Sequence, residues 1–260
     1  MDASRIDNAA GLLAEARIAE RKVGILPSNC RPESAANAYA IQAILHDRLA
    51  AAGHGAVTGW KIGCTTPVMQ AMLKIDSPCA GSMTDQGIHR DDATYQLTDT
   101  HRAGVECEIA VRLAADADDG PYDRTSVAEL VGAVMPAMEI VDDRYDDYTA
   151  MTAFDLTADD FFHVACLHGP ETTDWRSLDL TGLRGRTLID GTSVGEGIGG
   201  DVMGHPFEAL AWLANLNPGR GLRAGDIVMT GSVVATQWIN QPATAVTEID
   251  GLGSVTARFV

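Results

Sequence analysis

The feature of this sequence that most limits its possible folds is a series of short apolar runs separated by glycine. Each run is typical of a β-strand, and together they cover residues 57–63, 105–112, 134–141, 186–194, 226–231, 244–249 and 254–259. The helical patterns at about 127–133 and 206–216 interrupt this series without a regular rhythm. Doubly wound sheets and barrels of βα units require strands and helices to alternate, so both are disfavoured. The pattern therefore predicts a β-rich domain of mixed topology.

Two amphipathic patterns precede the β-rich region. The first covers residues 6–21, and the second opens near Pro32 and ends at Gly53. A length of 260 residues suits one sizeable domain. We therefore expect a single catalytic domain over residues 1–260, in which an N-terminal helical segment (1–55) leads into a β-rich, metal-binding core (56–260).

The charge balance excludes several classes of partner. Lysine and arginine number 19 against 36 acidic residues, which gives a net charge of −17, and the only lysines are Lys22, Lys61 and Lys74. Because an acidic chain without a basic block repels phosphate backbones and anionic lipid, we expect no nucleic acid or membrane partner. The sequence shows no signal peptide and no long apolar stretch, and its five cysteines are scattered, so a cytoplasmic location with free thiols is expected.

Three glutamates are candidate ligands for a metal ion. On a strand over 105–111, Glu106 and Glu108 point the same way, whereas the residues between and after them form an apolar face. Glu139 is flanked almost entirely by apolar residues, so we expect it to be buried. Three carboxylates suit Mg²⁺ or Mn²⁺, which prefer oxygen ligands. Alternatively, the first two form a solvated face and Glu139 pairs with Arg144. Spacing alone favours this alternative.

A set of short motifs extends along nearly the whole chain. They are Gly59–Thr65 (GWKIGCT), Val105–Glu108 (VECE), Pro136–Asp142 (PAMEIVD), Gly204–Pro206 with Ala209–Asn215, Ala224–Ser232 (AGDIVMTGS) and Asp250–Val255. In this order they resemble the motifs of the fumarylacetoacetate hydrolase superfamily. The match is best to its branch of 2-oxopent-4-enoate hydratases and oxalocrotonate decarboxylases. The resemblance implies an α+β fold, a mixed β-sheet roll or sandwich preceded by helices, and a homo-oligomer.

The resemblance also assigns roles to particular residues. The family's metal ligands fall on Glu106, Glu108 and Glu139. The implied Mg²⁺ or Mn²⁺ binds the carboxylate and 2-oxo oxygens of a small anionic 2-oxo acid and acts as a Lewis acid toward its enolate. Lys61 corresponds to the family's active-site lysine, which can pass a proton to or from the substrate. Ser232 is expected either to hydrogen-bond the substrate carboxylate or to serve as a turn residue.

The sequence departs from the hydratase pattern in two places. Cys79 replaces an aspartate that works with the lysine in the family, and it is expected at the substrate. Asp160 stands where the family has asparagine, and His163 stands where it has a serine-like residue. We expect Asp160 to supply the missing carboxylate and His163 to act as an acid or base. The alternative is a structural role for both, with Phe161 and Phe162 filling the core over a hydrogen-bonded His163.

These observations predict a metal-dependent lyase of the 2-keto-4-pentenoate hydratase type. It would add water to a small 2-oxo or 2-hydroxydienoic acid, with the metal holding the keto-carboxylate end and Lys61 moving protons. Two alternatives use the same metal and lysine, namely C–C bond hydrolysis of an acylpyruvate and decarboxylation of a 2-oxo diacid. The third alternative is a non-catalytic metal-binding scaffold, which the loss of the aspartate at Cys79 suggests.

Overall fold

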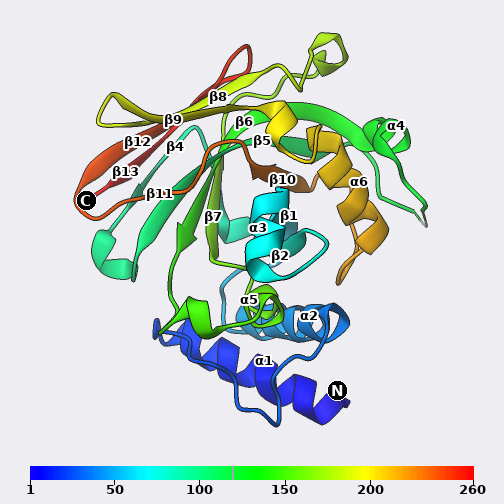
Figure 1. The fold of residues 1–260 in the computed structure, drawn as a ribbon, viewed down its shortest axis with the longest axis vertical. Helices are drawn as coiled ribbons and strands as arrows, with labels where there is room; N and C mark the ends of the chain where they lie inside the picture. Colours follow the sequence, from blue (N-terminus) through cyan, green and yellow to red (C-terminus); the bar gives the residue numbers. More distant parts are fainter. Residues whose placement is uncertain (119) are drawn as a thin grey trace.

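Two β-sheets form the body of the protein, and helices cover one end of it (Figure 1). The computed structural model describes residues 1–118 and 120–260. Within this part of the chain, one sheet has eight strands in the order β2-β1-β10-β5-β6-β7-β3, with β11 paired to β5, and the other has five in the order β4-β13-β12-β8-β9. The strands are β1 (Val57–Gly63), β2 (Cys79–Thr84), β3 (Ile88–Arg90), β4 (Asp92–Tyr95), β5 (Ala103–Leu113), β6 (Val131–Asp142), β7 (His163–His168), β8 (Arg184–Ile189), β9 (Thr192–Ile198), β10 (Ile227–Ser232), β11 (Gln237–Trp238), β12 (Ala243–Ile249) and β13 (Gly253–Phe259).

The pairing of the strands is mixed, as expected for the α+β class. Strands β1 and β10, β3 and β7, and β4 and β13 run parallel, whereas β5 pairs with β6 and β10 in antiparallel register. The helices are α1 (Ala3–Ile18), α2 (Ala35–Ala51), α3 (Pro67–Leu73), α4 (Arg124–Val127), α5 (Ala153–Ala158) and α6 (Pro206–Leu216). None of the helices in the described ranges is both long enough and apolar enough to cross a membrane.

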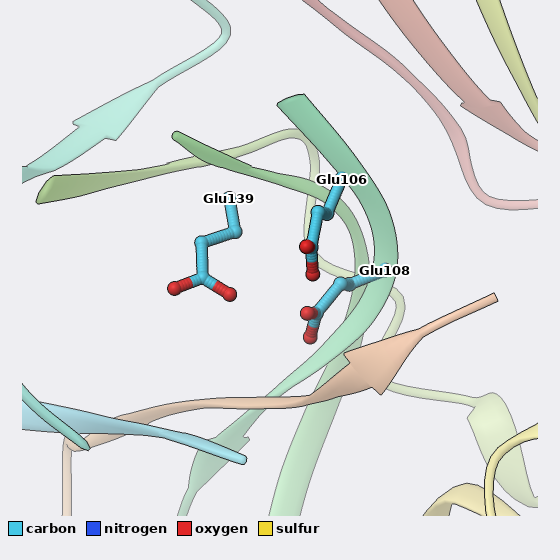
Figure 2. Close-up of side chains that lie close together, drawn as sticks. All are labelled: Glu106, Glu108 and Glu139. Carbon is cyan, nitrogen blue, oxygen red and sulfur yellow. The ribbon is translucent and has the colours of Figure 1, made fainter. Parts of the chain in front are cut away.

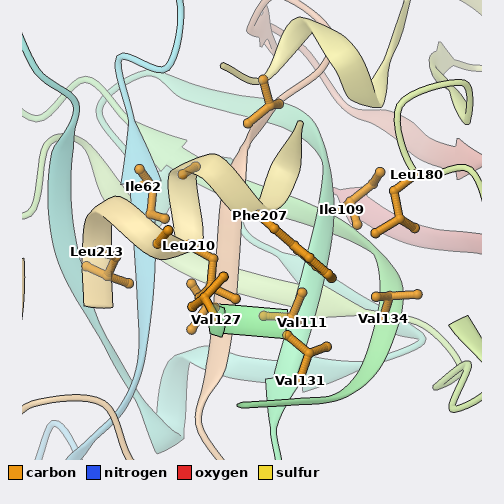
Figure 3. Packing of buried hydrophobic residues seen from close by; sticks show 14 of the residues in the cluster. Ile62, Ile109, Val111, Val127, Val131, Val134, Leu180, Phe207, Leu210 and Leu213 are labelled. Carbon is orange, nitrogen blue, oxygen red and sulfur yellow. The ribbon is translucent and has the colours of Figure 1, made fainter. Parts of the chain in front are cut away.

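Helix α6 closes the largest apolar core, and its bounds agree with the sequence pattern. His205 caps its N-terminus, because the Nδ1 atom accepts a hydrogen bond of 3.0 Å from the backbone N–H of Phe207. Phe207, Leu210 and Leu213 project from one face of the helix onto the strands beneath it (Figure 3). This packing holds β5, β6 and β10 together on the side of the sheet opposite the glutamates of β5.

The N-terminal helices form a second core beneath the β-sheet. Helices α1 and α2 pack against each other, and α5 packs against α2 (Figure 1). Buried Leu13, Ile41 and Leu45 share one apolar cluster with Cys79 and Phe161. The helical segment therefore packs against the start of β2 and the turn after α5, which carry the predicted site residues Cys79 and Asp160.

Two local predictions are wrong. The run at 186–194 is a hairpin rather than one strand, because Asp190 and Gly191 adopt positive φ angles of 49° and 79° and turn the chain between β8 and β9. The helix expected over 127–133 begins and ends earlier. Its N-cap is Asp123, whose carboxylate accepts from the backbone N–H groups of residues 125 and 126, and β6 already starts at Val131.

Truncation of Ile41 tests whether the helical segment folds together with the β-sheets. Ile41 is fully buried, so we expect Ile41→Ala to lower the free energy of unfolding by about 2–5 kcal/mol. The unfolding transition should remain single when far-UV circular dichroism and tryptophan fluorescence are compared during urea denaturation. Ile18→Ala, at an exposed site on α1, should change the free energy by less than about 0.5 kcal/mol. An early separate transition in the Ile41 variant would show that the segment is an independent unit.

Candidate metal centre and active site

Three carboxylates converge on the face of the large sheet that points away from α6. Glu106 and Glu139 lie directly opposite each other in the β5–β6 ladder, and Glu108 follows two residues later on β5. Figure 2 shows the three side chains turned toward one another. One carboxylate oxygen from each lies within 4.8 Å of the others. Because Glu108 and Glu139 are buried and Arg144 pairs with Asp159 instead, the alternative of a solvated face with a Glu139–Arg144 pair is wrong.

The hydrogen bonds of this carboxylate cluster (Glu106, Glu108 and Glu139) leave room for a cation. Glu108 Oε2 accepts from the backbone N–H of Gly231 at 2.8 Å, whereas its buried Oε1 has no hydrogen-bond partner among the residues that the structure describes. Glu106 accepts from the hydroxyl of Thr236. An unpartnered buried carboxylate oxygen is costly unless a cation or water satisfies it. Three oxygen donors of this kind fit a hard divalent ion such as Mg²⁺ or Mn²⁺.

The pKa values within the cluster reflect the same excess of negative charge. Burial, followed by repulsion from Glu139, raises the pKa of Glu106 to about 7. Burial and the two neighbouring carboxylates raise the pKa of Glu108 well above its usual range. Burial also acts on Glu139, but the Lys61 ammonium and the hydrogen bond from His163 together hold the pKa of Glu139 below its usual value. A bound cation would offset both the burial and the repulsion that raise these pKa values.

Lys61 on β1 is the cation that faces this cluster. Its Nζ atom lies 3.4 Å from Glu139 Oε1 and donates a hydrogen bond of 2.8 Å to the carbonyl oxygen of Phe161. Burial alone would favour the neutral amine, but Glu139 and then Glu106 raise the pKa of Lys61 above its ordinary value. The amine is therefore held, charged, between a carboxylate and a backbone carbonyl.

A cavity of about 590 Å³ opens beside Lys61 and Glu106. Most of its lining is apolar, and the cavity lies between the β-sheet, helix α3 and the loop after α5. The lining residues include Val68, Met69, Met72, Val141, Tyr148, Phe161, Phe162, Val233, Val234 and Trp238, together with Lys61, Glu106, Ser232 and Asp201. Apart from Lys61, no lysine or arginine of the described chain lines it.

The structure brings only some of the predicted substrate-side residues to this cavity. Ser232 lines it, and its hydroxyl donates to the carbonyl of Val234 at 2.5 Å. Cys79 does not line it, whereas Cys64 does. The two thiols lie against each other, and the hydrogen bond from Cys64 lowers the pKa of Cys79. Sequence reasoning missed Cys64 although it lies within the GWKIGCT motif.

Asp160 and His163 also lie behind the cavity wall. The carboxylate of Asp160 is fully buried among groups from the helical segment and β2. His163 Nδ1 is 2.8 Å from Glu139 Oε1, while its buried Nε2 has no hydrogen-bond partner in the described part of the chain. Burial lowers the pKa of His163. This arrangement corresponds more closely to the structural alternative considered for the pair, except that Phe161 and Phe162 line the cavity.

Comparisons with known proteins agree with this geometry. The family model described as "Fumarylacetoacetate (FAA) hydrolase C-terminal" matches residues 74–260. The chain is 34% identical over 263 residues to a 2-keto-4-pentenoate hydratase of Paraburkholderia phymatum, covering 99% of this chain and 98% of the relative. It is 33% identical over 259 residues to a 2-hydroxyhexa-2,4-dienoate hydratase of Comamonas testosteroni, covering 95% and 94%.

A solved structure matches the fold over its full length. This 4-oxalocrotonate decarboxylase from Pseudomonas putida G7, complexed with magnesium and adipate, gives a TM-score of 0.92 at 25% identity and covers 100% of this chain and 99% of its own. The chain therefore belongs to the fumarylacetoacetate hydrolase family, in its branch of hydratases and decarboxylases, and is an enzyme. This confirms the resemblance read from the motifs and the predicted roll with an N-terminal helical segment.

The raised pKa values predict how cation binding depends on pH. Protons compete with the cation for Glu106, so the affinity for Mn²⁺ should rise by about tenfold per pH unit, for each proton displaced, up to about pH 7. Above that pH the rise should become less steep, because Glu106 is then ionised and only protonation of Glu108, whose pKa is also raised, still opposes binding. Electron paramagnetic resonance of free Mn²⁺, titrated between pH 5.5 and 8, measures this. Glu196→Gln, at an exposed ion pair on β9, is the matched control and should reproduce the wild-type curve. An affinity independent of pH would contradict the assignment.

Proposed function

We propose that this protein is a hydratase that uses Mg²⁺ or Mn²⁺ to add water to a small 2-hydroxydienoate with an uncharged tail. The observation that carries the proposal is the carboxylate cluster beside Lys61, at a cavity whose remaining lining is largely apolar. Glu106, Glu108 and Glu139 would hold the metal ion. The 34% and 33% identical relatives, both hydratases, support the same reaction.

Hydration of a 2-hydroxydienoate requires protons to move between oxygen and carbon. The proton of the 2-hydroxyl group leaves, protons join C3 and C5, and the hydroxyl group of water joins C4. When bound, the metal ion supplies a Lewis acid for the 2-oxo and carboxylate oxygens of the substrate. The protein's own residues must then bind the chain, exclude bulk water and carry the protons.

Lys61 is the group best placed to carry a proton. It lines the cavity, and its pKa lies above the ordinary value, so the amine enters the reaction as an ammonium. An ammonium can donate to the carbon chain first and accept the hydroxyl proton afterwards. The carbonyl of Phe161 and the carboxylate of Glu139 fix two of the directions in which Nζ can donate.

His163 and Ser232 have supporting parts in this proposal. Because Nδ1 of His163 bonds to Glu139, the imidazole orients that carboxylate from behind, as partners of metal-binding carboxylates do. Ser232 reaches the cavity and can donate to a substrate carboxylate if its hydroxyl turns away from Val234. A homo-oligomeric assembly and a cytoplasmic location stay predictions from the sequence.

Decarboxylation of a 2-oxo diacid is the second candidate, because the full-length likeness to the solved decarboxylase favours it. A diacid would need a cation for its distal carboxylate. Among the described residues that line the cavity, Lys61 is the one lysine or arginine, and it lies at the carboxylate cluster. Val68, Met69 and Phe162 instead suit an alkyl tail. We therefore place hydration first.

Two substitutions distinguish a residue that is needed for turnover alone from one that is also needed for metal binding. Lys61→Met should lower kcat by about 10²–10⁴-fold, because a proton carrier is removed, and leave Mn²⁺ affinity equal or tighter, because a nearby positive charge is lost. Glu108→Gln should lose Mn²⁺ as well as activity. Loss of diene absorbance, together with CO₂ release, is measured on metal-stripped protein refilled with Mn²⁺. Loss of absorbance without CO₂ indicates hydration, whereas stoichiometric CO₂ would establish the decarboxylase instead. A shorter pair of acids would indicate hydrolysis.

The apolar lining predicts selectivity at the far end of the substrate. The protein should prefer 2-hydroxyhexa-2,4-dienoate, which ends in a methyl group, over the dienedioate of the same length. Met69→Arg introduces a cation at the cavity. It should lower the ratio of kcat/KM for the methyl-ended substrate to kcat/KM for the dienedioate by about fivefold, as expected for one exposed charge pair. Ile18→Arg, a comparably exposed apolar site on α1, should leave the ratio unchanged. A wild-type preference for the dienedioate would contradict the assignment of an uncharged tail.

A further inference from the structure

We propose that Asp160 is a positioning residue, through which α1 and α2 set the place of the Lys61 amine. The carboxylate of Asp160, held by Arg17 and His46, fixes a left-handed turn whose Phe161 carbonyl binds Lys61 Nζ. The consequence for turnover rests on the proposed function of Lys61. The positional claim itself does not, and it can be tested without substrate.

The turn is unusual in its backbone. Asp160, Phe161 and Phe162 follow one another with φ angles of 61°, 50° and 68°. Residues with a Cβ rarely adopt this left-handed region, and three in succession carry strain that surrounding contacts must offset. The turn lies directly between α5 and β7, so its shape decides where the Phe161 carbonyl points.

The contacts that hold the turn come largely from the N-terminal helices. Asp160 Oδ2 lies 2.6 Å from Arg17 Nη1 on α1 and 2.7 Å from His46 Nε2 on α2. Its Oδ1 accepts from the backbone N–H of Ser82 on β2 at 2.9 Å. The carboxylate is fully buried, and although burial opposes ionisation, His46 and then Arg17 hold the pKa of Asp160 far below its usual range.

A second layer of contacts holds the residue before the turn. Asp159 Oδ2 lies 2.7 Å from Arg144 Nε, and the same guanidinium donates to the carbonyl of His163 at 3.0 Å, on the other side of the turn. The turn is thus clamped at both ends. Among the described contacts, Asp160 is the only residue of this clamp whose carboxylate lies at hydrogen-bond distance from both α1 and α2.

Gly81 shows how closely the turn and the lysine are packed. A Cβ atom at this position would lie 2.8 Å from the carbonyl oxygen of Asp160 and 3.1 Å from Lys61 Cε. The lysine side chain therefore passes between β2 and the turn with no spare room. A shift of the turn by a few tenths of an ångström must move either Lys61 or its hydrogen bond to Phe161.

The position of Lys61 can be observed directly, because the chain has only three lysines. Protein labelled with ¹³C at Cε and ¹⁵N at Nζ of lysine gives three side-chain signals, and Lys61→Met identifies that of the buried lysine. Lys22 and Lys74 are exposed and serve as internal references. Metal-free protein is used, so the measurement depends on neither substrate nor Mn²⁺.

Asp160→Asn keeps the shape of the side chain but removes the charge that binds Arg17 and His46. We expect the Lys61 signal to shift or broaden. In Mn²⁺-loaded enzyme, kcat should fall by about ten- to a hundredfold with little change in KM. His46→Leu should act in the same direction, whereas His46→Gln, which retains a donor, should remain close to wild type. Gly81→Ala alters no charge and should displace the same signal.

Asp155→Asn is the matched control. Asp155 is a buried carboxylate on α5 that Arg31 Nε holds at 2.9 Å, so its loss destabilises the same region without touching the turn. The Lys61 signal and the kcat of the Asp155→Asn protein should equal those of the wild type. An unmoved Lys61 signal in folded Asp160→Asn and His46→Leu proteins overturns the proposal, as does an equal shift in Asp155→Asn. If the wild type turns over no dienoate, the proposed function fails while the lysine signals still decide the positioning.

Discussion

The structure depends on holding three mutually repelling carboxylates inside a β-sheet. Glu106 and Glu139 face each other across the β5–β6 ladder, where like charges destabilise strand pairing. Burial adds to this cost, as the raised pKa values of Glu106 and Glu108 show. The strands that bear these residues, of 11 and 12 residues, are buried along most of their length and covered by α6. Apolar packing at some distance from the glutamates therefore stabilises the arrangement that the site requires.

Two buried clusters of charge in the described chain differ in their balance. Around the turn at Asp160, two carboxylates meet two guanidinium groups and an imidazole, so opposite charges compensate each other. At the carboxylate cluster, three carboxylates meet one ammonium and the imidazole of His163, whose pKa is lowered by burial, so negative charge stays in excess. A balanced buried cluster can persist as it stands, whereas an unbalanced one requires an additional positive charge. This difference distinguishes a structural network from a site that binds a cation, although both contain buried acids.

Sequence patterns predict those helices and strands whose conformation is determined by residues within the element itself. Helix α6 has a cap, a proline at its first turn and a periodic apolar face, and β1 has its predicted bounds. Elements that depend on distant partners were missed or misplaced. Val131 and its neighbours look helical locally, but pairing with Leu113 draws them into β6. The short helix α5 and strand β2 carry weak local signals. Packing against α2 holds α5 in place, and antiparallel pairing with β1 holds β2.

The metal-binding residues could be proposed from the sequence because strand alternation places Glu106 and Glu108 on one face. What patterns do not reveal is which polar atoms remain without a partner. Glu108 and Asp160 are both fully buried acids within family motifs, and sequence reasoning assigned both to the reaction. Their hydrogen bonds come from residues between 78 and 143 positions away in the chain. Glu108 keeps one oxygen unpartnered and beside other carboxylates, whereas both oxygens of Asp160 are bound by the protein. An acid whose lone pairs are already used can hold a structure in place but has none left for a ligand. For Glu108 and Asp160, an unpartnered oxygen beside other carboxylates therefore separates the metal-binding acid from the structural one, which burial and motif do not.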